Sequence, residues 1–206
     1  EWHIDEIRFS GEIADQYLQV LANHERLKSE AKVRQLAFYD PLTDLANRRL
    51  LQETLHHELE GSRRRGTFGS LLYFDLDNFK TLNDALGHHI GDELLVQLSQ
   101  RLRRAVRSED IASRLGGDEF VVLIPGEYST REEAVEQAIQ VANKIQILIS
   151  KPYNLHAYEH VITSSIGIAL YPENHNSATD VLKQADTAMY QAKEDGKNTI
   201  RYDNYQ

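Results

Sequence analysis

The stretch RLGGDEFVV, residues 114–122, constrains the fold more than any other part of the chain. Gly116 and Gly117 separate two runs rich in strand-forming residues, DIASRL before them and FVVLIP after them. Glycine permits a tight reversal that a side chain would obstruct, so the pattern predicts a β-hairpin. Asp118 and Glu119 then begin the returning strand, either as a solvated hairpin tip or as two acids that a cation holds together.

Alternating helix and strand patterns surround this hairpin. In the predicted strand 70–79, alternation places Leu72, Phe74 and Leu76 on one face and Tyr73, Asp75 and Asp77 on the other. The order of elements predicts an α+β fold, with a β-α-β-β-α-β core sheet flanked by helices in the ferredoxin-like arrangement. The predicted helices are 48–66, 91–107, 131–150 and 177–196, and the further strands are 160–172 and 197–203.

Residues 1–37 predict a separate, extended helix that Asp40-Pro41 ends. Its apolar residues recur at helical spacing but form only a narrow stripe, and the other positions are polar or charged. Such a seam packs against a copy of itself as a parallel dimer, or the helix is a simple linker. We therefore expect a helix at 1–37 and a domain at 38–206. The stripe comprises Ile13, Tyr17, Val20, Leu21, Leu27 and Ala31.

Composition narrows the class of protein. The formal net charge of −9 argues against nonspecific nucleic-acid binding, so a site for phosphates needs local basic residues or a metal ion. The chain contains no cysteine, which excludes disulfides and thiolate chemistry and fits a cytoplasmic location. No apolar run approaches the roughly 20 residues of a membrane span, so we expect no membrane segment. The absence of an initial methionine suggests a fragment of a longer protein.

The acids predict a site for a hard divalent cation. Asp75 and Asp77 project from one face of a strand that the predicted fold places beside the hairpin, so three or four carboxylates are expected to converge. Oxygen ligands without cysteine suit Mg²⁺ or Mn²⁺ rather than zinc. Carboxylates around such an ion are typical of phosphoryl and nucleotidyl transfer.

Polar residues downstream of the acids could hold a nucleotide. The backbone amides of residues 78–80, with Lys80 as a point charge, could cradle phosphates. Asn83 and Asp92 could read a guanine edge, or they could cap helices. Lys193 and Lys197, four apart near a predicted helix end, could hold a triphosphate or complement the helix dipole.

Six motifs in order resemble the GGDEF family of diguanylate cyclases. They extend over about residues 38–203 and comprise DPLTDLANRR, FDLDNFKTLND, GHHIGDELL, SRLGGDEF, SIGIALYP and ADTAMYQAKEDGKN. The resemblance implies the nucleotidyl-cyclase palm fold and the condensation of two GTP into cyclic di-GMP and two pyrophosphates. It also implies a homodimer, because each domain holds one GTP in half of a site. The N-terminal helix would then hold two domains in or out of register.

The resemblance also implies a role for individual residues. Asp118 and Glu119 are catalytic, and both bind the metal together with Asp75 and the main-chain carbonyl of Leu76, while Asp77 supports this site. Position 197 holds lysine where many members of the family carry arginine, which implies a less rigid phosphate contact. The substrate-binding residues are Asn78, Phe79, Lys80, Asn83, His88, Asp92, Gly116, Gly117, Lys193 and Lys197.

Two further features bear on regulation. Arg107 and Asp110 in RSED match the family's RxxD motif, which implies an inhibitory site for cyclic di-GMP; otherwise they form a helix end. The stretch EIADQYLQVLANHERL resembles the last helix of a GAF sensor domain. The alternatives to an active cyclase are a non-catalytic module that binds GTP or cyclic di-GMP, and the middle of a tandem protein with a following EAL phosphodiesterase domain.

Overall fold

The computed structural model describes residues 4–156, 158–173 and 177–202. The chain divides into two compact units, Glu1–Phe38 and Tyr39–Gln206. The first unit is helix α1, Ile4–Phe38, as the N-terminal pattern predicts. Of the predicted apolar stripe, Leu21 and Leu27 are 42% and 58% exposed, so within this single chain neither is covered. The other stripe residues, Ile13, Tyr17, Val20 and Ala31, lie outside the side chains that the structure describes.

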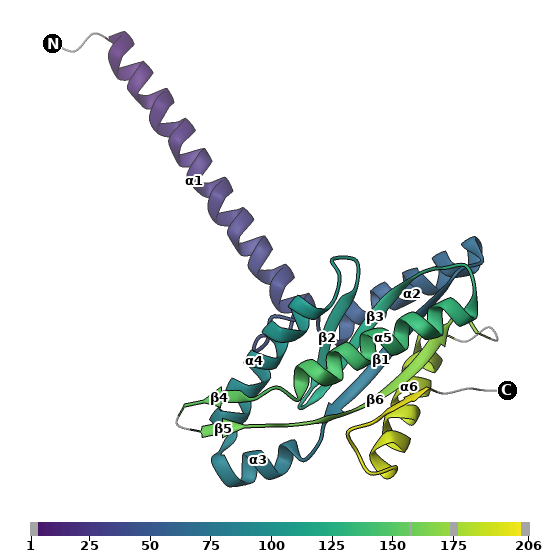
Figure 1. The fold of residues 1–206 in the computed structure, drawn as a ribbon. Helices are drawn as coiled ribbons and strands as arrows, with labels where there is room; N and C mark the ends of the chain where they lie inside the picture. The colour runs from purple at the N-terminus through teal and green to yellow at the C-terminus, as the bar shows by residue number, and fades with distance from the viewer. Residues whose placement is uncertain (1–3, 157, 174–176, 203–206) are drawn as a thin grey trace. The chain divides into compact units, whose positions relative to one another are not determined.

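The second unit is built on a five-stranded sheet with the order β2-β3-β1-β6-β7 (Figure 1). The first four strands pair antiparallel, and β7 adds to β6 in parallel. This order confirms the ferredoxin-like core, because β1 lies between β3 of the hairpin and β6. The strands are β1 (Phe68–Leu76), β2 (Ile111–Gly116), β3 (Glu119–Tyr128), β6 (Ser164–Tyr171) and β7 (Ile200–Tyr202).

Helices cover both faces of the sheet (Figure 1). Leu72, Phe74 and Leu76 are buried in one cluster with residues of α3 (Phe79–Leu86), α4 (His88–Ala105) and α5 (Arg131–Ile149). Leu71 and Tyr73 are buried in a second cluster with residues of α2 (Arg48–Arg65) and α6 (Ala178–Glu194). The alternation predicted for β1 is therefore confirmed, and each fully buried leucine contributes roughly 1.5–3 kcal/mol.

Several predicted element boundaries are wrong, including those of the helix expected over 91–107, which is α4 at His88–Ala105, and of the strand expected from residue 197, which begins at Ile200. The strand expected over 70–79 ends at Leu76, because Asn78 adopts a left-handed backbone conformation with φ 61° and α3 begins at the next residue. The strand expected over 160–172 is two strands: β5 (Tyr158–His160) pairs with β4 (Tyr153–Leu155), and β6 begins only at Ser164. Helix α6 ends at Glu194 rather than Gly196.

No helix among residues 4–156, 158–173 and 177–202 has the length and apolar character that crossing a membrane requires.

Candidate functional site

The hairpin turn brings the predicted acids to one end of the sheet. Gly116 and Gly117 have φ of 146° and 52°, values that side chains disfavour, and they carry the chain from β2 towards β3. Asp118 lies in this turn, so the expectation that it begins the strand is wrong by one residue, and Glu119 begins β3. Asp75 lies directly opposite Glu119 in the β1–β3 register. The prediction that the first strand lies beside the hairpin is confirmed.

The acids do not meet at a single point. Lys193 Nζ lies 2.8 Å from Asp75 Oδ1, and Arg48 Nη2 lies 3.8 Å from Glu119 Oε2. Among the residues that the structure describes, no three acidic or histidine side chains are arranged to hold an ion. The expected convergence of three or four carboxylates into an ion-binding group is therefore wrong for the side chains as they lie, and basic residues of the same chain pair with two of the acids.

The charged form of Asp75 is disfavoured by burial and by the two neighbouring acids. Burial raises its pKa to about 6, with Asp118 and Glu119 adding to the rise and the hydrogen bond with Lys193 opposing it. The ion pair with Lys193 therefore offsets only part of the cost of a charged carboxylate beside two other acids. Such a group favours any further positive charge that approaches it.

Arg114, which sequence reasoning missed, fixes the glycine turn. Its Nε and Nη2 donate to the carbonyl oxygen of Gly117 at 3.0 and 2.8 Å. Its Nη1 donates to both carboxylate oxygens of Asp40 at 3.0 and 3.2 Å. Thr43 donates to Asp40 through its backbone N–H and its hydroxyl. The glycine turn is thus bound to the segment that follows α1 in sequence.

Asp40 is held ionised by this network. Burial works to raise its pKa, but the hydrogen bonds from Thr43 and Arg114 outweigh burial and leave the pKa below its ordinary value. Nothing in the sequence identified Asp40 as the partner of Arg114, because the two residues are 74 positions apart.

Asp77 is a structural anchor in this fold rather than an open ligand. Its side chain is almost fully buried and accepts hydrogen bonds from Thr163 Oγ1 at 2.6 Å and Ser165 Oγ at 2.7 Å. The backbone N–H of Asn198 adds a third at 3.0 Å. Asp77 therefore ties the end of β1 to β6 and to the loop after α6.

The predicted phosphate residues surround the same end of β1. Asn78 precedes α3 without capping it through its side chain, and Lys80 is exposed in the first turn of that helix. Phe79 is buried in the core, so its side chain packs and only its backbone faces the helix end. Lys197 Nζ donates to Asn78 Oδ1 at 2.6 Å.

The geometric argument for the lysine pair is wrong in detail. Lys193 is on α6, but Lys197 follows its end in a left-handed conformation with φ 66°, so the two are not on one helix face. They still reach the same place, since their partners Asp75 and Asn78 are three residues apart.

Asn83 and Gly91 form a close contact between α3 and α4. A Cβ added to Gly91 would lie 1.9 Å from Asn83 Oδ1 and 3.1 Å from Phe79 Cζ. The Asn83 oxygen is itself buried and has no hydrogen-bond partner. A buried amide oxygen without a partner costs about 1–3 kcal/mol, so this position suits a ligand that donates a hydrogen bond.

The helix-capping interpretation of Asn83 and Asp92 is wrong. Asn78 and Gly87 flank α3, and Gly87 and Val106 flank α4. Asp92 and His88 are both exposed on α4, with His88 as its first residue. Gly91 was missed, although a glycine inside a helix pattern costs about 1 kcal/mol relative to alanine and signals close packing or a ligand.

Arg107 and Asp110 form a tight turn between α4 and β2. The Arg107 N–H donates to Asp110 Oδ2 at 2.8 Å, and the Asp110 N–H donates to the Arg107 carbonyl oxygen at 3.3 Å. Burial raises the pKa of Asp110. The six residues of β2 separate this turn from Gly117, a distance of roughly 20 Å for an extended strand.

The donor chemistry at the end of β1 fits a hard divalent cation. The candidate ligands are carboxylates and a backbone carbonyl, which Mg²⁺ and Mn²⁺ prefer. An ion there would take the place of Lys193 beside Asp75.

Comparisons with known proteins agree with this geometry. Residues 37–199 match the family described as diguanylate cyclase, GGDEF domain. The chain is 44% identical over 164 residues to MucR of Pseudomonas aeruginosa, named a bifunctional diguanylate cyclase/cyclic di-GMP phosphodiesterase. That match covers 80% of this chain but 23% of MucR, so the chain spans about a quarter of its relative's length.

Solved structures give the same result. The GGDEF domain of TpbB from Pseudomonas aeruginosa has a TM-score of 0.73 at 34% identity, covering 80% of this chain and 99% of that one. The coiled coil and GGDEF domain of DgcB from Caulobacter crescentus, solved with c-di-GMP, has a TM-score of 0.80 at 27% identity. That second match covers 94% of this chain and 98% of the DgcB chain.

Proposed function

The chain belongs to the GGDEF family of diguanylate cyclases, and from this premise we propose that it condenses two GTP into cyclic di-GMP and two pyrophosphates. In each half-reaction the 3′-hydroxyl oxygen of one GTP bonds to the α-phosphorus of the other, and the bond from that phosphorus to pyrophosphate breaks. The fold is the nucleotidyl-cyclase palm of this family. GTP as substrate accords with a cytoplasmic location.

The single observation that carries the proposal is the unpartnered oxygen of Asn83 beside Gly91. Guanine presents N–H donors on one edge, and an amide oxygen and a carboxylate accept from such donors. We assign this edge to Asn83 and Asp92, which lie on adjacent helices, with His88 next to the nucleotide. The absence of a side chain at Gly91 leaves room for the Asn83 oxygen between α3 and α4.

The triphosphate would then lie along the start of α3. The N–H groups at residues 78–80 have no intrahelical partner at a helix start and can donate to phosphate oxygens. Lys80, Lys193 and Lys197 supply positive charge there, and Gly116 and Gly117 let the hairpin backbone approach the substrate. Lys193 reaches the phosphates once it leaves Asp75.

Asp75, Asp118, Glu119 and the Leu76 carbonyl would hold the metal, which we propose is Mg²⁺ or Mn²⁺. When bound, such an ion neutralises charge on the phosphates and lowers the pKa of the attacking hydroxyl. Asp118, in the turn between the strands, is the candidate acceptor of the hydroxyl proton. Asp77 keeps β1 in place through its three hydrogen bonds.

Each domain holds half of the reaction, so two copies must face each other. We propose that residues 1–37 are a signalling helix whose exposed Leu21 and Leu27 belong to the seam of a parallel dimer, and that residues 38–206 are the cyclase domain. That this signalling helix is the last helix of a GAF domain stays a prediction. Arg107 and Asp110 would bind cyclic di-GMP and inhibit, at a turn well separated from the acids.

A second candidate function is a module that binds GTP without turning it over. The Lys193–Asp75 ion pair favours it, because the acids are neutralised within the chain as the side chains lie. MucR, named as bifunctional, shows that related sequences occur in longer proteins with phosphodiesterase activity.

Incubation of the purified chain with GTP and Mg²⁺, followed by nucleotide chromatography, tests the proposal. Cyclic di-GMP as product, with specific activity that rises with protein concentration, supports a cyclase with two half-sites. Bound but unconverted GTP supports the second candidate. Specific activity that is constant across a wide dilution series would contradict the need for two copies.

A further inference from the structure

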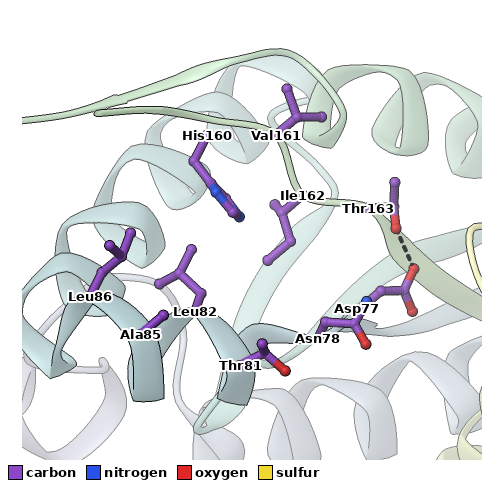
Figure 2. Close-up of a pocket in the computed structure, with 10 residues that line it drawn as sticks. All are labelled: Asp77, Asn78, Thr81, Leu82, Ala85, Leu86, His160, Val161, Ile162 and Thr163. Atoms are coloured by element: carbon purple, nitrogen blue, oxygen red, sulfur yellow. Dashed lines mark hydrogen bonds between the residues drawn. The ribbon is translucent and has the colours of Figure 1, made fainter. Parts of the chain in front are cut away.

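A pocket that adjoins the proposed nucleotide site and shares Asn78 with it lies between α3 and the segment that joins β5 to β6 (Figure 2). Leu82, Ala85 and Leu86 of α3 line one side, and residues 160–163 line the other. Its volume of about 440 Å³ falls within the range of roughly 300–1,000 Å³ for small-molecule sites.

The pocket and the nucleotide site use different faces of one helix. Residues three and four apart share a helix face, so Asn78, Leu82 and Leu86 face the pocket. Asn83 is adjacent to Gly91 on α4 instead. The pocket is therefore not part of the guanine site.

The floor of the pocket is apolar and buried. Leu82 and Ile162 are 4% and 3% exposed, so they form a firm floor, and Val161 at the rim is 53% exposed. Figure 2 shows the imidazole of His160 directed into the space above Leu82 and Ile162. A neutral imidazole carries one N–H donor and a protonated one carries two. The pocket thus combines an apolar floor with a hydrogen-bond donor on His160, in addition to the polar side chains of Asn78 and Thr81.

The inner end of the pocket touches the catalytic framework. Thr163, a lining residue, donates its hydroxyl to Asp77, as the dashed line in Figure 2 marks. Asp77 also holds Ser165 and the backbone of Asn198, which follows the phosphate residue Lys197. A molecule in the pocket would contact both the start of α3 and the residue that fixes Asp77.

We propose that this pocket binds a small, mainly apolar ring compound with one oxygen that accepts a hydrogen bond from His160. Its rings would lie on Leu82 and Ile162, against Ala85 and Leu86. Occupancy would restrain α3 and Thr163 and so alter turnover at the active site. The effect on turnover rests on the proposed function, whereas binding does not.

Methyl-detected NMR with 2-naphthol as the probe tests binding directly. The methyl signals of Leu82, Leu86 and Ile162 should shift and saturate as 2-naphthol is added to the full chain. Ala85→Trp fills the pocket from an exposed position and should abolish these shifts. Asp84→Trp, at the neighbouring exposed position that does not line the pocket, is the matched control and should retain them.

Two more measurements sharpen the test. His160→Phe keeps a ring but removes the donor, and it should weaken binding by about fivefold, the cost of one hydrogen bond. In wild type, 2-naphthol should slow formation of cyclic di-GMP, and in Ala85→Trp it should not. Circular dichroism confirms that each variant is folded.

Equal shifts in wild type and Ala85→Trp would overturn the site. So would shifts confined to α1, or shifts that follow protein concentration rather than 2-naphthol, which would mark self-association. Saturable binding with an unchanged rate in an active enzyme would overturn the coupling alone. If no variant converts GTP, the methyl shifts still decide whether the site exists.

Discussion

Replacing Gly91 by alanine tests the nucleotide site at its most sensitive contact. The new Cβ would lie 1.9 Å from Asn83 Oδ1, far inside van der Waals contact. The amide is the movable end of a side chain, so Asn83 should rotate away while the backbone stays in place. The substitution therefore removes the proposed guanine acceptor from its position without deleting any atom of it.

Gly91→Ala is expected to raise the stability of the fold and to lower the affinity for GTP. Alanine in place of glycine in a helix interior contributes about 1 kcal/mol to stability, so the melting temperature should not fall. Loss of the hydrogen bond between the base and Asn83, at about 1–1.5 kcal/mol, should lower GTP affinity roughly 5- to 10-fold. Discrimination between GTP and ATP should fall along with affinity, since both depend on the same edge.

Calorimetric titration with 3′-deoxy-GTP, which lacks the attacking hydroxyl, measures this affinity without turnover. Gly61→Ala is the matched control, because its Cβ would meet only the guanidinium end of Arg65 at 2.9 Å, on α2. It should leave GTP affinity within about twofold of wild type, because Gly61 lies on α2, away from the proposed guanine contacts on α3 and α4. The double variant Asn83→Ala with Gly91→Ala should bind no more weakly than Asn83→Ala alone.

GTP affinity within about twofold of wild type in a folded Gly91→Ala protein, short of the loss expected for one hydrogen bond to the base, would refute the reasoning. A lowered melting temperature, rescued by Asn83→Ala, would show that the two residues meet for packing alone.

Three further predictions follow from the site and its supports. Asp118→Asn should lower formation of cyclic di-GMP by at least about 100-fold, and retention of more than about a tenth of the rate would remove Asp118 from the catalytic set. Arg107→Ala should raise the ratio of late to initial rate in progress curves, and curves that bend as early as the wild type's would contradict an inhibitory site. Because the pKa of Asp40 is lowered by folding, its ionised form stabilises the domain above its ordinary pKa near 4 and loses this effect as pH falls through the lower folded value. Urea unfolding should therefore show Asp40→Asn destabilised at pH 7 and close to wild type near pH 2, and an equal difference at both values would contradict the sign.

Much of the fold could be predicted because local signals agree with it. The glycine turn and the alternation of Leu72, Phe74 and Leu76 were enough to place β1 beside the hairpin. Helix α3 was missed because it has only eight residues and no glycine or proline before it. Strand β1 ends before α3 because Asn78 adopts a left-handed backbone conformation. Asparagine tolerates this conformation, but an asparagine in a sequence does not predict it. Strands β4 and β5 have three residues each, too few for a periodic pattern.

The site could be predicted only as a set of residues, not as an arrangement. Sequence identified Asp75, Asp118 and Glu119, but not that Lys193 and Arg48 would pair with two of them. Those pairs join elements more than 70 residues apart, and no local rule reports them. Arg114 was missed for the same reason, since its partner Asp40 is 74 positions away.

The pairing of Lys193 with Asp75 has a consequence for how the proposed substrates bind. In the free domain, this lysine supplies part of the positive charge that the crowded acids need. A cation at Asp75 would remove that need, and the freed ammonium group would face the phosphates. GTP with a bound cation brings the cation to Asp75 and the phosphates to Lys193, so it would make both changes at once. Cation binding and GTP binding therefore favour each other. Thermodynamic linkage requires that a cation tighten GTP binding by the same factor as GTP tightens cation binding. Lys193→Met should weaken GTP binding while strengthening cation binding in the absence of nucleotide, because it removes the competitor at Asp75 along with the phosphate contact.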